Sequence, residues 1–260
     1  MTSIEKLLEV MARLRDPDNG CAWDLRQDFK SIAPYTLEEA YEVADAIERE
    51  DMPDLEAELG DLLFQVVFHA QMAKDAGLFD FSDVAAGVAD KMTRRHPHVF
   101  GTDEELEKGA DEDSWERIKA AERKAGGDDS ALAGVAKALP ALKRAQKLGA
   151  RAGRVGFDWP EMSGARAKIN EELAELEEAV GTRRQEDINE EFGDLLFAVV
   201  NLARHLNVDP EQALTGSNYK FEARFRDMEA AIRAEGEEMA DLTLETLEQH
   251  WRAAKRRLKP

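Results

Sequence analysis

The chain has 260 residues and a formal net charge of −20, and it is long enough for two modest domains that each bury a core. This charge argues against a general nucleic-acid-binding protein, because the chain as a whole offers nothing to displace counterions from phosphates. The single cysteine, Cys21, excludes an internal disulfide bond and a zinc site built from thiolates. No apolar run approaches the roughly 20 residues of a membrane span, so we expect a cytoplasmic protein without membrane partners.

Sparse glycine and proline, with abundant alanine, leucine, glutamate and arginine, predict an all-α protein without strands. In chain order, apolar residues at helical spacing predict helices over residues 3–15, 36–49, 53–76, 82–95, 112–124, 137–152, 163–180, 184–206, 209–234 and 242–257. Thr36 and Glu39 have the spacing of a capping box, and Ser82 and Ser163 are expected N-caps. His96-Pro97 should end the helix over 82–95.

A Gly-containing stretch over residues 125–130 separates two halves of similar size. We therefore predict helical domains over residues 1–124 and 137–260, joined by a linker over 125–136. Three further motifs recur in the same order in the two halves. They are Lys91-x-x-x-Arg95 with Lys220-x-x-x-Arg224, Trp115-x-x-x-Lys119 with Trp251-x-x-x-Lys255, and the run Gly60-Asp61-Leu62-Leu63-Phe64 with Gly193-Asp194-Leu195-Leu196-Phe197. This order indicates a duplicated unit with small loop insertions.

The acidic residues also follow one pattern twice. Glu38-Glu39-x-x-Glu42 and Glu58-x-x-Asp61 return 133 positions later as Glu171-Glu172-x-x-Glu175 and Glu191-x-x-Asp194. Residues three or four apart share one face of a helix, so an antiparallel hairpin turning near residues 50–53 would bring four carboxylates together. Such a cluster is costly unless a hard divalent cation binds it, and oxygen ligands favour Mg²⁺, with Mn²⁺ as a substitute.

Acidic residues at this spacing could also arise without a magnesium site. Solvated surface glutamates would account for one copy, but two copies at a fixed spacing beside the same apolar run argue against them. A di-iron carboxylate bundle also gathers glutamates between helices, and it uses Glu-x-x-His. None of the five histidines of this chain has an acidic residue three positions before it, which removes the iron site.

Basic and aromatic residues of the second half have spacings that suit a nucleotide. Lys220 and Arg224 lie one helical turn apart and could bind the same phosphate oxygens, although an ordinary exposed pair is the alternative. The indole of Trp251 could stack on a base or belong to the core. Lys168 lies four residues before Glu172, where the first copy has a tyrosine, Tyr35.

Together these motifs resemble the MazG nucleoside triphosphate pyrophosphohydrolases of the all-α NTP pyrophosphatase superfamily. Glu-Glu-x-x-Glu followed by Glu-x-x-Asp is the signature of that family. The segments 20–24, 58–69 and 95–100 look like the first domain of its two-domain bacterial members, with Ala22 in place of the usual proline. The resemblance covers nearly the whole chain.

The resemblance implies two tandem helical-bundle domains, a homodimer, and Mg²⁺-dependent hydrolysis of nucleoside triphosphates to the monophosphate and pyrophosphate. It implies metal ligands Glu172, Glu175, Glu191 and Asp194 and nucleotide contacts Lys168, Lys220, Arg224, Trp251 and Lys255. We expect Glu172 or Glu175 to act as general base, and stacking on Trp251, which tolerates every base, predicts broad base specificity. The first copy keeps Glu39, Glu42, Glu58 and Asp61, while the second half is expected to be the catalytic one. A non-catalytic helical module whose acidic face binds a basic partner is the alternative.

Overall fold

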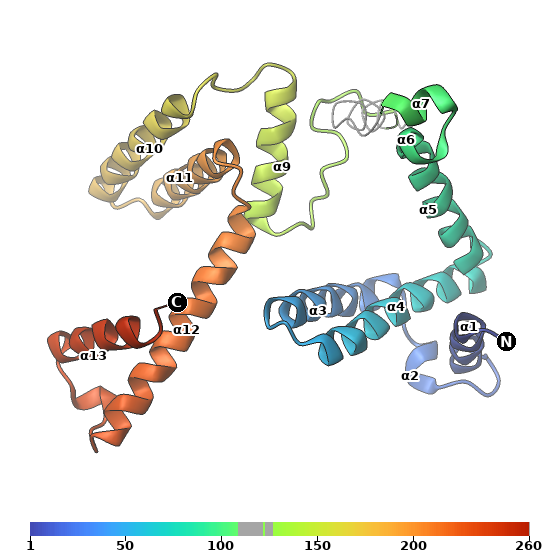
Figure 1. Ribbon diagram of the computed structural model, residues 1–260, viewed down its shortest axis with the longest axis horizontal. Coiled ribbons are helices and arrows are strands. Elements are labelled where there is room, and N and C mark those ends of the chain that lie inside the picture. Colours follow the sequence, from blue (N-terminus) through green and yellow to red (C-terminus); the bar gives the residue numbers. More distant parts are fainter. Residues whose placement is uncertain (109–121, 123–126, 260) are drawn as a thin grey trace. The chain divides into compact units, whose positions relative to one another are not determined.

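The computed structural model describes residues 1–108, 122 and 127–259 of the chain, and within them every regular element is helical (Figure 1). This confirms the predicted all-α class. The chain divides into two compact units, Met1–Ala120 and Ala121–Pro260. The predicted linker over 125–136 and the exact domain limits stay predictions. The helix predicted over 112–124, with Trp115 and Lys119, falls outside the described residues except at position 122.

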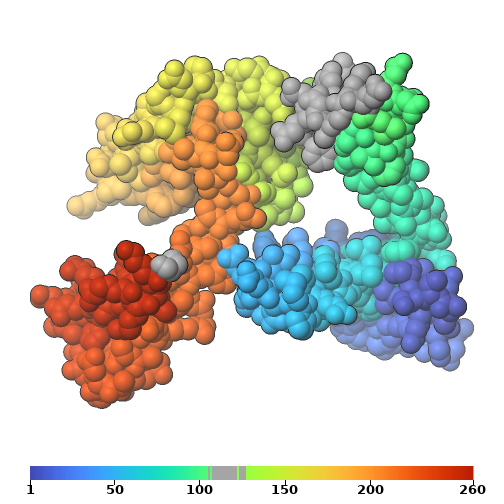
Figure 2. Space-filling view, viewed as in Figure 1, coloured from blue at the N-terminus to red at the C-terminus, as the bar shows by residue number. Residues whose placement is uncertain are grey.

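The first unit is built around a helical hairpin. Its helices are α1 (Ser3–Leu14), α2 (Ala22–Leu25), α3 (Phe29–Glu48), α4 (Met52–Asp75), α5 (Phe81–Arg95), α6 (Pro97–Phe100) and α7 (Asp103–Lys108). Helices α3 and α4 pack along each other, and α1 packs against α4. The side chains of α3 and α4 (blue to cyan) form one continuous packed body in Figure 2. The core consists of Met11, Ile32, Val67, Phe68 and Met72.

The second unit contains the corresponding hairpin. Its elements are α9 (Ala141–Arg154), α10 (Met162–Thr182), α11 (Gln185–His205), α12 (Pro210–Ala234), a 3₁₀ turn η1 (Met239–Asp241) and α13 (Leu244–Arg257). Helices α10 and α11 pack along each other, and α9 packs against α11 (Figure 1). Helix α12 packs mainly on α13 around Met228, Ile232 and Ala254.

Three predicted helix caps were wrong. Helix α3 begins at Phe29 because Asp28 and Ser31 form its capping box, so Thr36 lies inside the helix and its hydroxyl hydrogen-bonds Ile32 and His69. The N-cap of α5 is Asp80 rather than Ser82, since the carboxylate of Asp80 accepts from two backbone N–H groups of the first turn. Helix α10 starts after Glu161, which makes Ser163 its second residue.

The stop at His96-Pro97 is confirmed, because α5 ends at Arg95 with His96 as its C-cap. The proline ring removes a backbone donor and disfavours helical geometry in the preceding residue. None of the described helices combines the length and the apolar character needed to cross a bilayer.

Candidate active site

The hairpin of α10 and α11 brings three predicted carboxylates together. Only Arg183 and Arg184 join the two helices, and Arg183 turns the chain in the left-handed conformation with φ of 59°. Glu172 and Glu175 share one face of α10, and Glu191 lies on α11. One carboxylate oxygen of each lies within 4.8 Å of the other two. This spacing is short enough for one cation to bind all three carboxylates.

Glu172 is the buried member of this cluster, with only 4 % of its surface exposed. Its Oε1 lies 2.7 Å from the ammonium of Lys168, which also contacts the carboxylate of Glu171 at 2.6 Å. Its Oε2 is buried and has no hydrogen-bond partner among the described residues. A buried carboxylate oxygen without a partner is costly, and a bound cation is the group that would satisfy it.

The electrostatics of the cluster favour a cation as well. Desolvation by the neighbouring protein groups raises the pKa of the exposed Glu175, and the negative charge of Glu172 raises it further. Burial also raises the pKa of Glu191, followed by the charges of Glu175 and Glu172. Both shifts mean that the folded chain disfavours the charged carboxylates, so a divalent cation would remove the repulsion.

Asp194, the fourth predicted ligand, lies three residues after Glu191 on the same helix. Its charge contributes to the raised pKa of Glu191, which places it in the same electrostatic environment. It does not belong to the group of three whose oxygens lie within 4.8 Å of one another. Whether Asp194 binds a cation directly stays a prediction.

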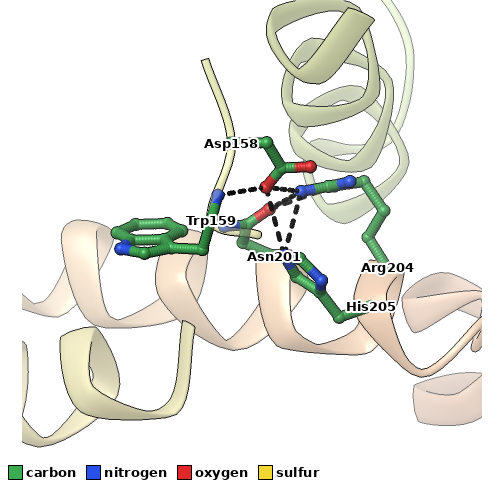
Figure 3. Close-up of polar contacts among 5 residues, drawn as sticks. All are labelled: Asp158, Trp159, Asn201, Arg204 and His205. Carbon is green, nitrogen blue, oxygen red and sulfur yellow. Dashed lines mark hydrogen bonds and ion pairs between the residues drawn. The ribbon is translucent and has the colours of Figure 1, made fainter. Parts of the chain in front are cut away.

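A polar network holds the segment that leads into α10 (Figure 3). The carboxylate of Asp158 accepts from Arg204 Nη2 and from the backbone N–H of Trp159, and it lies 3.1 Å from His205 Nε2. Arg204 also donates to the side-chain oxygen of Asn201. The Arg204 guanidinium holds the pKa of Asp158 below its ordinary value. Because Asp158 precedes α10 and its partners end α11, this latch fixes the two helix ends to each other.

Trp159 adds a packing contact to the same end of the hairpin. A Cβ atom built on Gly164 would lie 2.1 Å from Cδ1 of the indole, a distance that real Cβ atoms do not reach. The indole therefore lies directly against the backbone of the first turn of α10. This contact requires glycine at position 164.

The remaining predicted nucleotide residues lie on α12 and α13. Lys220 is exposed and Arg224 is half-buried one turn further along α12. Trp251 packs against the core of Met228, Ile232 and Ala254, and its ring centroid lies 5.3 Å from that of Phe221. The described hydrogen bonds and ion pairs join none of the residues Lys220, Arg224, Trp251 and Lys255 to the carboxylate cluster. Of the predicted nucleotide contacts, the structure places Lys168 alone in contact with a carboxylate of the cluster.

Residues 27–100 and 162–228 match the model of the MazG nucleotide pyrophosphohydrolase domain, and these are the segments that carry the two hairpins. The chain belongs to the MazG family. It is 51 % identical over 258 residues to a protein of Escherichia coli strain K12 named nucleoside triphosphate pyrophosphohydrolase, covering 98 % of each chain. It is 44 % identical over 251 residues to a Thermotoga maritima protein named nucleoside triphosphate pyrophosphohydrolase/pyrophosphatase MazG, covering 96 % of this chain and 95 % of the relative.

The first MazG segment contains a second carboxylate cluster on α3 and α4. Oxygens of Glu39, Glu58 and Asp61 lie within 4.8 Å of one another. Burial raises the pKa of Glu39, and the charge of Asp61 adds to this shift. Glu42 is the second cause, after burial, of the raised pKa of Glu58. This group corresponds to Glu172, Glu191 and Asp194 of the second half, so the two clusters share two of their three motif positions.

Sequence reasoning missed several residues that shape these MazG sites. The spacing of four between Lys168 and Glu172 is a signal for an ion pair on a helix, but the prediction assigned the lysine to phosphate instead. Gln65 donates its amide to Glu39 across 26 positions, and Asp158 bonds Arg204 across 46 positions. Neither long-range contact leaves a periodic signal in the sequence.

Proposed function

We propose that this MazG chain hydrolyses nucleoside triphosphates to the nucleoside monophosphate and pyrophosphate, with the active site on the α10–α11 hairpin. Two observations carry the proposal: the gathering of Glu172, Glu175 and Glu191, and a buried oxygen of Glu172 that has no hydrogen-bond partner among the described residues. The names of the Escherichia coli and Thermotoga maritima relatives support the same activity.

Mg²⁺ fits this group of side chains, because the donors are all carboxylate oxygens and Glu172 Oε2 has no hydrogen-bond partner in the described part of the chain. Glu172, Glu175 and Glu191 would hold it, with Asp194 one turn away. When bound, the ion would neutralise triphosphate charge and lower the pKa of a coordinated water. Mn²⁺ has the same ligand preference and would substitute.

The burial and charge of the surrounding groups suggest a different role for each of the three side chains Glu172, Glu175 and Lys168. Glu172 is buried and paired with Lys168, so its carboxylate is better suited to hold Mg²⁺ than to accept a proton. Glu175 is exposed and has a raised pKa, which makes it the better acceptor for the proton of the attacking water. Lys168 lies at the edge of the cluster, where its ammonium can contact a phosphate oxygen.

Lys220 and Arg224 would stabilise charge on the departing pyrophosphate, Arg224 in a fork and Lys220 as a point charge. Stacking of a base on Trp251 would tolerate every base, which agrees with broad specificity. Lys255, one turn after Trp251, would contact the same nucleotide. These assignments require the α12–α13 helices to approach the carboxylates when nucleotide binds.

We also propose that the chain is a homodimer through the exposed apolar face of α11. Phe192, Leu196 and Val199 follow helical spacing and are 52 %, 43 % and 45 % exposed. A hairpin of two helices is one layer thick and leaves such a face uncovered, so a second copy would bury it. Leu196→Glu should give a monomer by light scattering after gel filtration, with Leu244→Glu as an exposed control that leaves the mass unchanged. A dimeric Leu196→Glu variant would reject this interface.

Product analysis tests the activity most directly. The protein is incubated with Mg²⁺ and each of the common nucleoside triphosphates, and the phosphate products are separated. AMP with pyrophosphate from ATP supports the proposal, whereas ADP with orthophosphate would contradict it.

The Glu172→Gln variant connects the activity to the site. It should lower turnover at least about 100-fold, since removing a ligand costs more than disturbing the residues around it. Its helical circular dichroism should be unchanged, because glutamine has nearly the same shape. Glu222→Gln is the matched control, since Glu222 is an exposed carboxylate on α12 that pairs with Arg226. Full turnover by Glu172→Gln would place the active site elsewhere.

A further inference from the structure

The two carboxylate clusters differ in what touches the second glutamate of the motif, Glu172 in one half and Glu39 in the other. In the second half, the ammonium of Lys168 lies 2.7 Å from Glu172 Oε1. In the first half, the amide nitrogen of Gln65 donates to Glu39 Oε1 at 3.2 Å. A cation thus pairs with one glutamate and a neutral amide with the other.

The sequence differs between the two halves at the positions of both contacting side chains. Tyr35 stands four residues before Glu39, where the second half has Lys168 before Glu172. Gln65 stands seven residues after Glu58, and Ala198 stands seven residues after Glu191.

Gln65 supplies a second, independent observation that points to a bound cation. Gln65 is only 8 % exposed, and its side-chain N–H group donates to Glu39 of the cluster. Its Oε1 is buried without a hydrogen-bond partner among the described residues. A buried amide oxygen needs a donor, and a water in the hydration shell of a cation is such a donor.

The charges predict opposite behaviour of the two clusters toward a free cation. The side chain that hydrogen-bonds Glu39 is neutral, and the guanidinium of Arg49, whose charge also acts on Glu58, forms its ion pairs with Asp45, Asp51 and Asp54. A divalent cation there meets three carboxylates, none of which pairs with a cation in the described part of the chain. In the second half the cation would lie close to the ammonium of Lys168, which repels it until a phosphate draws the lysine away.

We propose that the first half binds a divalent cation in the absence of nucleotide, whereas Lys168 makes cation binding in the second half depend on a bound triphosphate. The first part stands on the α3–α4 hairpin alone, and the second part rests on the proposed function. The first half would then be a permanently loaded cation site, and the second half would load metal and substrate together.

The test counts Mn²⁺ bound to the full-length protein by electron paramagnetic resonance, without nucleotide. The wild type should bind one Mn²⁺ per chain at least about tenfold more tightly than any other. The matched variants are Glu58→Gln and Glu191→Gln, which change the same position of the motif in the two halves. Glu58→Gln should lose the tight ion and Glu191→Gln should keep it. Asp61→Asn repeats the first-half test in case Glu58→Gln does not fold.

A reciprocal exchange tests the lysine. Lys168→Tyr should add a second tight Mn²⁺ per chain without nucleotide, and Tyr35→Lys should weaken the first at least about tenfold. Tyr35 is 42 % exposed, so a lysine fits there. In the wild type, α,β-methylene ATP should bring the count to two, and this added ion should be absent from Glu191→Gln.

Four results would overturn the proposal: no tight ion in the wild type, two ions of equal affinity, loss of the tight ion in Glu191→Gln, or no gain in Lys168→Tyr. These counts need no turnover. Failure of ATP cleavage therefore refutes the proposed function separately, while a wrong ion count in an active enzyme refutes only this inference.

Discussion

The latch at Asp158 offers a quantitative test of how the site is held in place. Replacing Asp158 by alanine removes the acceptor of Arg204, of His205 and of the Trp159 backbone N–H. The side chains of Asp158, Arg204 and His205 are only 23 %, 19 % and 14 % exposed, so water replaces these bonds incompletely. Arg204 keeps Asn201 as a second acceptor, which limits the loss.

We therefore expect the free energy of opening the start of α10 to fall by about 1.5–3 kcal/mol, the range for hydrogen bonds to charged groups. Backbone amides of the first turns of α10 should exchange hydrogen roughly 10 to 150 times faster, as measured by mass spectrometry of peptides across residues 155–170. The matched control is Glu222→Gln, which removes an exposed ion pair with side chains 74 % and 54 % exposed and should cost under about 0.5 kcal/mol.

The pH dependence has a definite sign. Because the pKa of Asp158 is lowered in the folded chain, its contribution to stability is complete above the unfolded pKa and is lost as pH falls through the folded one. The alanine variant should thus differ from the wild type at neutral pH and approach it in acid. If Asp158→Ala and Glu222→Gln accelerate exchange equally at neutral pH, the latch does not hold the helix.

Three further predictions concern stability. Glu191→Gln should raise the melting temperature in Mg²⁺-free buffer at neutral pH, because the pKa of Glu191 is raised and its charged form therefore costs stability increasingly as pH rises through the folded pKa. Mg²⁺ added together with α,β-methylene ATP should raise the melting temperature of the wild type more than that of the variant, and an equal rise would contradict a shared cation site. Gly164→Ala should lower the free energy of unfolding in urea titrations by about 1–3 kcal/mol, because its Cβ atom would collide with Trp159. Gly181→Ala, on the same helix, has open space around the added Cβ atom and should be neutral or stabilising. Similar effects of the two substitutions would argue against the collision. Phe68→Ala should lower the free energy of unfolding of the first unit by about 3–5 kcal/mol, because the phenylalanine is only 1 % exposed. A decrease under about 1 kcal/mol would show that the surrounding core side chains collapse into the space of the deleted ring.

The parts of the fold that sequence predicted are those specified by local patterns. Helical spacing of apolar residues placed the α10–α11 hairpin within one or two residues at each end. The spacing of three within each acidic pair then put Glu172 and Glu175 on one face, and the structure brings Glu191 to them. The helical periodicity and the two-residue connection leave few other ways in which these two helices could pack.

The missed features depend on choices that local patterns do not make. At the start of α3 two capping signals compete, and Asp28 with Ser31 forms the cap although Pro34 follows inside the helix. Pro34 is the sixth residue of α3, so its ring removes the N–H that would bond the carbonyl of Lys30, and the helix nevertheless begins at the Asp28 cap. The bonds of Gln65 to Glu39 and of Asp158 to Arg204 depend on how packed helices are rotated about their axes, which one sequence does not specify.

The two-residue connection between α10 and α11 has a consequence for the order of folding. All three clustered carboxylates lie within twenty residues of one another, on consecutive helices. Contacts between segments so near in the chain cost little loop-closure entropy and form early. We expect this acidic hairpin to form before α12 and α13 have packed on each other.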